Sequence, residues 1–412
     1  MIGSILKVVF ARLLPLLVVG VAIFVGWCNL DESVPWEGRL FVVLIPLLKG
    51  YLPPILFGHG RLGAAKETPP VPEDWVPRPR PEGELFATLA GTGDRMPRNG
   101  LGMCCRPTAY DDVSVERSIE WFLLMGGRHI DGAHLYLNHA AIGRGVANAM
   151  ARGVPREEIF LTTKIWPADF GYHRTLEKVP TYLRELNLDY VDMLLMHFPA
   201  AMAGGMPRYC KADGRTMKEC RQDTWKALSE LRARGLIRNV GVSNFATHHL
   251  EELLELPQEG SANDTDSSTN TTSTTNTTNF AGVAPISNNQ ISWSPWVPKE
   301  WLETVEFCRA NHIAITGYSS LGGSLEHHKA LTIDTLTDLA AKHDRSVAQI
   351  MLRWALQTGA TIIPGTGNPA YMAENLSVYG FVLSDRDMDS IEALRESDDA
   401  KKFFTMKPIP NE

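Results

Sequence analysis

The sequence has no excess of positive charge and few cysteines, and each of these shortages argues against one class of protein or site. Its 412 residues carry a formal net charge of −7. Nucleic-acid-binding proteins concentrate Lys and Arg on one face, so no nucleic-acid partner is expected. The six cysteines form no C-x-x-C pair, and no histidine stands at zinc-finger spacing from them, so we predict no metal site. A disulfide framework is not expected at this density, and we expect reduced thiols in a cytosol-facing domain.

A dinucleotide-binding fingerprint after a first strand is also lacking. The one G-x-G-x-x-G match, at residues 58–63, follows an apolar stretch, and Pro69 and Pro70 soon after it leave no room for the helix that the fingerprint needs. We interpret this match as a turn. An open doubly wound sheet is therefore the weaker alternative for the fold.

Two long apolar runs lie at the N-terminus. Residues 8–27 are interrupted by one charge, Arg12, and can cross a bilayer core of about 30 Å as a helix. Residues 40–57 are a weaker candidate, because Lys49 and prolines interrupt them. A cleaved secretory signal is the alternative for the first run, but the second run has no place in a signal peptide. We predict a membrane anchor at residues 1–60 with one or two spans.

The placement of Lys and Arg predicts which side of the membrane the remaining chain faces. Lys7 and Arg12 lie at the start of the first run, and Arg61 and Lys66 follow the second. The loop between the runs, residues 28–39, holds more acidic than basic side chains. Short loops rich in Lys and Arg stay cytoplasmic, so we expect a hairpin with the rest of the chain in the cytosol.

Three further segments are set apart by composition. Residues 61–84 are rich in proline, which favours an extended, semi-rigid linker. Residues 258–280 contain a long run of Ser, Thr, Asn and Asp, which cannot bury apolar surface and should be disordered. Residues 396–412 form a C-terminal tail. The predicted globular domain is therefore 85–395.

Short apolar runs alternate with amphipathic helical stretches across this domain. The runs predicted as buried strands are 101–103, 129–133, 160–164, 192–197, 237–244, 286–292, 314–319 and 361–365. Alternation of strand and helix predicts a parallel sheet covered by helices. Eight such units in a domain somewhat longer than about 250 residues fit an α/β fold of the closed (β/α)8 TIM-barrel type.

Polar side chains stand where three successive strands end, which is where such barrels carry function. Asp131, Lys164 and His197 occupy these ends, and Tyr136 follows in a loop. Each alone is more often structural, but the four together fit carbonyl reduction, which needs a proton donor beside the carbonyl oxygen. Tyr136 can supply that proton, and Lys164, held by Asp131, should lower the pKa of the phenol from about 10. His197 can orient the carbonyl oxygen.

The order and spacing of motifs over residues 96–394 resemble the aldo-keto reductase family. The matching stretches include HIDGAHLYLNHAAIG (129–143), EIFLTTKIW (158–166), YVDMLLMHFP (190–199), GLIRNVGVSNF (235–245), GYSSLGG (317–323) and IIPGTGNPAYMAENL (362–376). The resemblance implies a catalytic tetrad of Asp131, Tyr136, Lys164 and His197. It also implies cofactor-binding residues: Ser243, Asn244 and Gln290 at the nicotinamide carboxamide, Tyr318 on its ring, Ser319 and Leu321 at the pyrophosphate, and Glu374 and Asn375 at the adenine.

The sequence departs from the family pattern at the cofactor phosphate. Gly365 and Tyr371 stand where Lys and Arg usually grip the 2′-phosphate of NADPH. The cofactor is therefore NADPH or NADH with the preference left open, although Thr366 is able to bond a phosphate or a ribose hydroxyl.

The substrate pocket and its surroundings also depart from the pattern. The expected pocket residues are Cys104, Trp166 and Phe198, where Cys104 and Phe198 each replace a family Trp. His139 replaces the Glu of an Asn-Glu pair. The chain between Tyr318 and Thr332 is short, so a flap over the cofactor is expected to be reduced.

Together these features predict a membrane-associated, NAD(P)H-dependent oxidoreductase that reduces aldehydes or ketones, or runs in reverse. Its partner would be a small carbonyl compound, and Tyr136 would be the general acid. The alternative is a membrane-associated, nicotinamide-binding regulatory or scaffold module with little turnover, which fold alone does not exclude.

Overall fold

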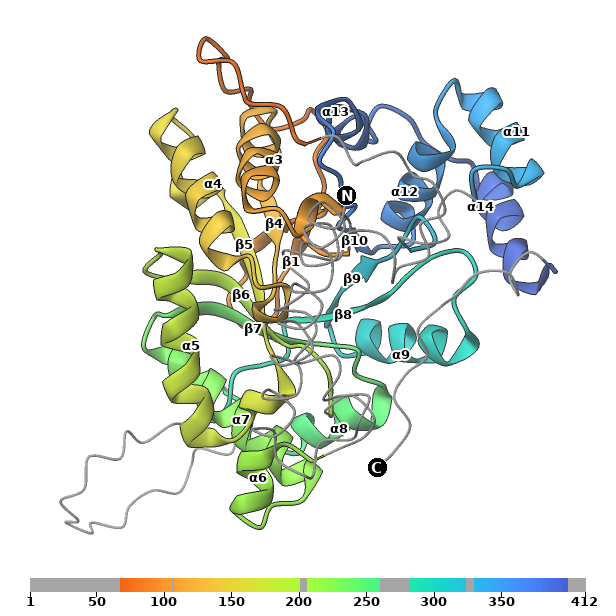
Figure 1. The fold of residues 1–412 in the computed structure, drawn as a ribbon. Helices are drawn as coiled ribbons and strands as arrows, with labels where there is room; N and C mark the ends of the chain where they lie inside the picture. The colour runs from red at the N-terminus through yellow and green to blue at the C-terminus, as the bar shows by residue number, and fades with distance from the viewer. Residues whose placement is uncertain (1–66, 106, 201–205, 260–281, 324–329, 399–412) are drawn as a thin grey trace, which may run out of the picture.

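The computed structural model describes residues 67–105, 107–200, 206–259, 282–323 and 330–398. An eight-stranded parallel sheet has the order β10-β9-β8-β7-β6-β5-β4-β3, so strands adjacent in the sequence are adjacent in space. A parallel bridge between Asn99 and Ile362 joins the first strand to the last and closes the sheet into a barrel (Figure 1). The strands are β3 (Gly100–Gly102), β4 (His129–Asp131), β5 (Phe160–Ile165), β6 (Val191–Met196), β7 (Ile237–Ser243), β8 (Asn288–Ser292), β9 (Ala314–Tyr318) and β10 (Thr361–Ile362).

Helices surround the barrel (Figure 1). They are α3 (Asp112–Leu124), α4 (His139–Ala151), α5 (Tyr172–Leu186), α6 (Arg208–Ala212), α7 (Met217–Ala233), α8 (Thr247–Leu254), α9 (Lys299–Ala310), α11 (Asp334–His343), α12 (Val347–Gln357), α13 (Pro369–Leu376) and α14 (Asp385–Glu392). Short 3-10 turns are η1 (Pro107–Ala109), η2 (His134–Tyr136), η3 (Arg156–Glu158), η4 (Pro167–Asp169) and η6 (Ala393–Glu396). The (β/α)8 barrel predicted from the alternation is confirmed.

The helix α3 shows how these elements form. The Asp111 side chain accepts a 2.9 Å hydrogen bond from the backbone N–H of Ser114 and so begins the helix. Val115, Ile119 and Phe122 follow at helical spacing and are buried in the main apolar core. Burial of each such side chain contributes about 1.5–3 kcal/mol.

A short antiparallel hairpin, β1 (Phe86–Thr88) and β2 (Arg95–Pro97), precedes the barrel and was not predicted. Leu89 and Met96 from it form a separate apolar cluster with residues of the barrel strands, namely Phe160, Met193 and Leu195. Because Phe160 begins β5, the hairpin lies at the N-terminal end of the barrel and covers it. The site must therefore open at the other end.

Residues 67–84, predicted as a linker, lie against α3 and α4. The Trp121 indole donates a 2.9 Å hydrogen bond to the carbonyl oxygen of Pro69. The rings of Trp75 and Trp121 meet edge to face with centroids 4.8 Å apart. Arg152, the C-cap residue of α4, donates a hydrogen bond to the carbonyl oxygen of Pro72 at 2.8 Å. This proline-rich segment is thus packed along the helices, not held apart as a spacer.

The predicted membrane spans at 8–27 and 40–57 lie outside the described residues, as do the Ser/Thr/Asn run and most of the C-terminal tail. Within the part of the chain that the structure describes, no helix combines the length and apolar character needed to cross a bilayer.

The expectation of reduced thiols is wrong for four cysteines, which form two disulfides. Cys210 on α6 is bonded to Cys220 on α7, with Cα atoms 5.5 Å apart. Cys104, just after β3, is bonded to its neighbour Cys105. Cys308 is a free, buried thiol, and burial raises its pKa to about 12. The pairing of Cys210 with Cys220 depends on the turn between two helices, which the spacing of cysteines does not reveal.

Candidate active site

Asp131, Lys164 and His197 lie at the C-terminal ends of the adjacent strands β4, β5 and β6. The register aligns Asp131 with Thr162 on β5, and the His197 backbone N–H donates a 3.0 Å hydrogen bond to the carbonyl oxygen of Ile165. All three functional side chains are buried. The strand ends therefore bring together residues that are far apart in the sequence.

Lys164 is the centre of this group. Its ammonium donates hydrogen bonds to Oδ1 of Asp131 at 2.6 Å and to the carbonyl oxygen of Gly132 at 2.8 Å. The phenol oxygen of Tyr136 lies 3.5 Å from the same nitrogen. Burial lowers the pKa of Lys164, whereas the Asp131 carboxylate acts in the opposite direction. The carboxylate thus keeps a cation in a place where burial alone disfavours it.

Tyr136 ends the 3-10 turn η2, in the loop between β4 and α4. Asn138 fixes this loop, because its side-chain amide donates to the carbonyl oxygens of Met103 at 3.0 Å and Ala109 at 3.3 Å. Burial raises the pKa of Tyr136 well above its usual value, and Asp131 adds to the rise. Lys164 therefore does not bring the pKa of Tyr136 below its usual value in the structure described. Its cation is engaged by Asp131 and Gly132, and desolvation of the phenolate dominates.

His197 faces Tyr136 within an aromatic group. The His197 ring contacts Tyr136 and Trp166 edge to face, with centroids 5.7 and 5.4 Å away, and stacks on Phe198 at 5.1 Å. Burial, with the charge of Lys164, lowers the pKa of His197 well below its usual value, so the ring is neutral at pH 7. Its Nδ1 is buried without a hydrogen-bond partner among the described residues.

The predicted pocket residues divide into two groups. Trp166 and Phe198 lie against His197 and each other, with ring centroids 5.7 Å apart for the last pair. Cys104 lies in the loop after β3, half-buried and bonded to Cys105. The two aromatic rings thus make an apolar wall beside His197, whereas Cys104 contributes a disulfide.

The residues predicted at the nicotinamide end also meet at strand ends. Ser243 ends β7 and Asn244 follows it, and the Ser243 hydroxyl donates to the carbonyl oxygen of Gln290 at 2.9 Å. The Tyr318 hydroxyl donates to the Asn244 side chain at 2.7 Å. The side-chain amide of Gln290 donates to Oδ2 of Asp131 at 2.7 Å. This last bond, which the sequence did not reveal, ties the predicted cofactor group to the Lys164 pair.

The residues predicted at the phosphate and adenine end are more scattered. Ser319 has a left-handed backbone with φ 55°, and Leu321 packs against the core. The Thr366 hydroxyl accepts from the backbone N–H of Asn368 at 3.0 Å. Gly365 and Tyr371, which stand where the family pattern usually has Lys and Arg, are both exposed.

Glu374 and Asn375 lie together on α13. Glu374 is hydrogen-bonded to Ser346 and borders a surface cavity of about 490 Å³. The other residues that line this cavity are Ala340, Ala341, Asp344, Arg345, Ser346 and Gln349. Asn375 is buried, and its carbonyl oxygen accepts from the Asn99 side chain at 2.8 Å. Residues of α11, α12 and α13 line this cavity, and none of the proposed tetrad does. The cavity is therefore not the reacting centre, which we place at the strand ends where the tetrad lies.

The (β/α)8 fold, with polar side chains gathered at the C-terminal ends of its strands, is that of a barrel oxidoreductase. Residues 99–396 match the Aldo/keto reductase family, and the chain belongs to that family.

Relatives and solved structures agree with this assignment. The chain is 33% identical over 302 residues to a 9,11-endoperoxide prostaglandin H2 reductase of Trypanosoma cruzi, covering 73% of this chain and 89% of that protein. It is 33% identical over 306 residues to a glyoxal reductase of Bacillus subtilis, covering 74% and 91%. A Bombyx mori aldo-keto reductase in complex with NADP is similar in structure, with TM-score 0.60 and 27% identity over 78% of this chain and 97% of that one. NAD(P)H-dependent carbonyl reduction is typical of the family.

Proposed function

We propose that this chain reduces aldehydes or ketones to alcohols with Tyr136 as the general acid. The observation that carries the proposal is the position of the Lys164 ammonium, 2.6 Å from Asp131 and 3.5 Å from the Tyr136 oxygen. A phenol, a cation and a neutral imidazole lie together at one end of the barrel. Such groups can donate hydrogen bonds to a carbonyl oxygen and stabilise the negative charge that it gains during reduction.

The described residues fit the nicotinamide end of a cofactor. The amides of Asn244 and Gln290 and the hydroxyl of Ser243 lie beside the proposed tetrad, and His197 Nδ1 is buried without a described partner. A buried polar atom of this kind is costly, by about 1–3 kcal/mol, unless a bound molecule or water meets it. When bound, the nicotinamide supplies the hydride that attacks the carbonyl carbon.

Tyr136 then supplies the proton. The raised pKa keeps the phenol protonated at neutral pH, which is the form that a donor needs. Its O–H proton passes to the carbonyl oxygen, and the nearby ammonium of Lys164 stabilises the phenolate that remains. His197, neutral because it is buried, donates one ring N–H to the same carbonyl oxygen and orients it. Positioned proton transfer of this kind contributes about 10²–10⁴-fold to rate.

The wall made by Trp166 and Phe198 favours carbonyl compounds with an apolar or planar group. Aromatic side chains supply contact area, while specificity comes from the few polar groups that fix orientation. The names of the Trypanosoma and Bacillus relatives refer to an endoperoxide and a small dialdehyde, so substrate size is not common to these relatives. We therefore begin a substrate panel with both small and aromatic aldehydes.

Cofactor choice is proposed to be weakly discriminating. Exposed Gly365 and Tyr371 offer no positive charge to the 2′-phosphate that distinguishes NADPH from NADH. Thr366 offers only a hydroxyl. Titration of the purified chain with each cofactor measures the preference, and a hundredfold preference for NADPH, about 2.7 kcal/mol, would contradict this proposal.

The rival hypothesis is a nicotinamide-binding regulatory or scaffold module. Its support is the uncharged phosphate end. The two functions differ in turnover, so the test follows nicotinamide absorbance with aldehydes and ketones, alongside cofactor titration. Turnover of any of these carbonyl compounds favours the reductase, whereas cofactor binding without turnover across the panel favours the module.

The N-terminal anchor is likewise a proposal, resting on the apolar runs at 8–27 and 40–57 and their positive flanks. A hairpin leaves the barrel in the cytosol, where Asn270 and Asn276, each in an Asn-Thr-Thr sequon, escape glycosylation. The disulfide between Cys210 and Cys220 is more usual in an oxidising compartment, so it weighs against this side of the membrane. Expression in eukaryotic cells followed by endoglycosidase treatment tests it. A mobility shift would place the barrel in the lumen, whereas protease access to the barrel in sealed microsomes without a shift supports the hairpin.

A further inference from the structure

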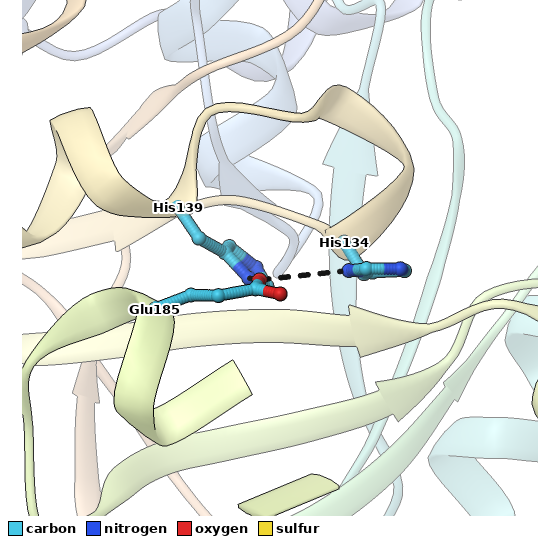
Figure 2. A group of neighbouring side chains, drawn as sticks. All are labelled: His134, His139 and Glu185. Atoms are coloured by element: carbon cyan, nitrogen blue, oxygen red, sulfur yellow. Dashed lines mark hydrogen bonds and ion pairs between the residues drawn. The ribbon is translucent and has the colours of Figure 1, made fainter. Parts of the chain in front are cut away.

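His134, His139 and Glu185 meet although they come from three different elements. His134 begins η2, His139 begins α4, and Glu185 lies in the last turn of α5. One ligand atom from each side chain lies within 4.8 Å of the others. Figure 2 shows the two imidazoles, which come from one stretch of chain, facing the Glu185 carboxylate, which comes from a separate helix.

The separations within this group resemble those between ligands of one ion. Nδ1 of His139 is hydrogen-bonded to Oε2 of Glu185 at 2.9 Å, a bond that an ion would replace, and Nδ1 of His134 lies 3.7 Å from the same oxygen. The second contact is too long for a hydrogen bond. A tetrahedral ion with bonds of about 2.1 Å places neighbouring ligand atoms about 3.4 Å apart. Small rotations of the side chains would bring all three atoms to that spacing.

Groups outside the cluster already orient both imidazoles. Nε2 of His139 is hydrogen-bonded to the Thr163 hydroxyl at 2.8 Å, which leaves Nδ1 to face Glu185. Metal-bound histidines commonly use their second nitrogen in this way. The His134 ring stacks on Tyr182, with centroids 4.5 Å apart and planes 23° apart. The rings are therefore held in place by contacts that a bound ion would leave intact.

Exposure and ligand type indicate which ion the group would take. The exposed fractions of the side chains are 3% for His139, 22% for His134 and 40% for Glu185, so an ion and a water molecule can enter from the Glu185 side. Two imidazoles and a carboxylate with one open position are a ligand set used for zinc. Mg²⁺ and Ca²⁺ prefer oxygen ligands alone.

We propose that His134, His139 and Glu185 form a binding site for one divalent transition ion of the Zn²⁺ type. The ion links η2 to α4 and α5. Because η2 ends at Tyr136, the ion holds in place the loop that carries the proposed general acid. This revises the sequence-based expectation of no metal site, which considered motif spacing and not the convergence of three elements.

The test measures metal binding by the purified full-length chain after removal of metal with a chelator. Equilibrium dialysis against ZnCl₂ gives the stoichiometry and affinity, and Co²⁺ as a substitute gives visible absorption bands that report the coordination number and geometry of the site. His134→Phe keeps a ring to stack on Tyr182 but has no nitrogen, and Glu185→Gln keeps the shape of the side chain. His312→Asn is the control, because His312 is exposed and its left-handed backbone, φ 58°, suits asparagine.

The expected result is one ion per chain whose affinity falls at least tenfold in His134→Phe and in Glu185→Gln, and is unchanged in His312→Asn. Zn²⁺ should also raise the Tm of the unmodified chain by a few degrees and leave that of His134→Phe unchanged. Circular dichroism confirms that each variant is folded. No saturable binding, or equal affinity in the unmodified chain and both cluster variants, would overturn the proposal. These readouts do not depend on turnover, so they stand apart from the test of the reductase.

Discussion

The Lys164 ammonium and the Asp131 carboxylate form an ion pair of 2.6 Å in which the side chains are 0% and 3% exposed. Both charges lie at the mouth of the barrel, beside the phenol of Tyr136. A buried pair of this kind is weak support for stability, because desolvation offsets the attraction. Its position beside a proton donor is what gives it a function in this account.

Asp131→Asn is expected to destabilise the protein by about 3–5 kcal/mol, because it leaves the Lys164 ammonium buried without its counter-charge. Adding Lys164→Met should restore most of the stability but not the activity. Urea unfolding measures both effects, with the exposed Asp189→Asn as a control that changes stability by less than about 0.5 kcal/mol. A loss below about 1 kcal/mol in the single variant would mean that the pair is not buried as described.

Gly365→Lys combined with Tyr371→Arg is expected to tighten NADPH by at least about tenfold and to leave NADH nearly unchanged. The two new cations would meet the 2′-phosphate, which NADH lacks. Fluorescence titration with each cofactor measures the change. Equal tightening of both cofactors would show that these positions do not face the phosphate.

Replacing residues 261–279 with a short Gly-Ser link is expected to leave kcat/KM within about twofold, because closure entropy depends weakly on loop length. The ends of the segment are already joined: the backbone N–H of Val283 donates to the carbonyl oxygen of Pro257 at 2.7 Å, and that of Glu259 donates to Val283 at 2.9 Å. A connection from helix to strand also lies at the end of the barrel opposite the site. A folded deletion with a large fall in turnover would refute this placement.

Stability is expected to fall in acid partly through Asp387. Its carboxylate accepts hydrogen bonds from Lys342 at 2.7 Å, His343 at 3.0 Å and the backbone N–H of Ser384 at 3.1 Å. These bonds hold the pKa of Asp387 well below its usual value. A carboxylate whose pKa is lowered by folding stabilises the folded chain at pH values above its pKa in the unfolded chain, about 3.9. This stabilisation is lost as the pH falls below that value.

The variant Asp387→Asn should therefore cost about 1–2 kcal/mol at neutral pH. The difference from the unmodified chain should shrink as the pH falls below about 4. Urea unfolding across this range, with exposed Asp389→Asn beside it, measures the difference. A difference that is independent of pH would show that ionisation of Asp387 is not its source.

The sequence alone predicted the barrel because its signals are local. Buried strands such as 192–197 are short, mostly apolar runs, and a parallel barrel places their ends at one edge. Asp131, Lys164 and His197 could therefore be expected to meet. Tyr136, in a loop, was singled out by its chemistry as a proton donor and not by periodicity, and the resemblance to a family implies the same role.

What the sequence did not reveal depends on contacts over long separations or on short elements. The hairpin strands β1 and β2 have three residues each, too few to show alternation. The bond from Gln290 to Asp131 spans 159 positions, and the contact of His139 with Glu185 spans 46. Such contacts follow from how the barrel closes, which pattern reading does not resolve.

The proposed role of Tyr136 as general acid is tested most directly by Tyr136→Phe, measured by single-turnover reduction of an aldehyde with bound cofactor. The variant keeps the ring that contacts His197 and removes only the hydroxyl, so the loss should fall on the chemical step. We expect a fall of at least about 10²-fold in the rate of reduction, with cofactor affinity nearly unchanged. A variant that retains most of the activity of the unmodified chain would contradict this role.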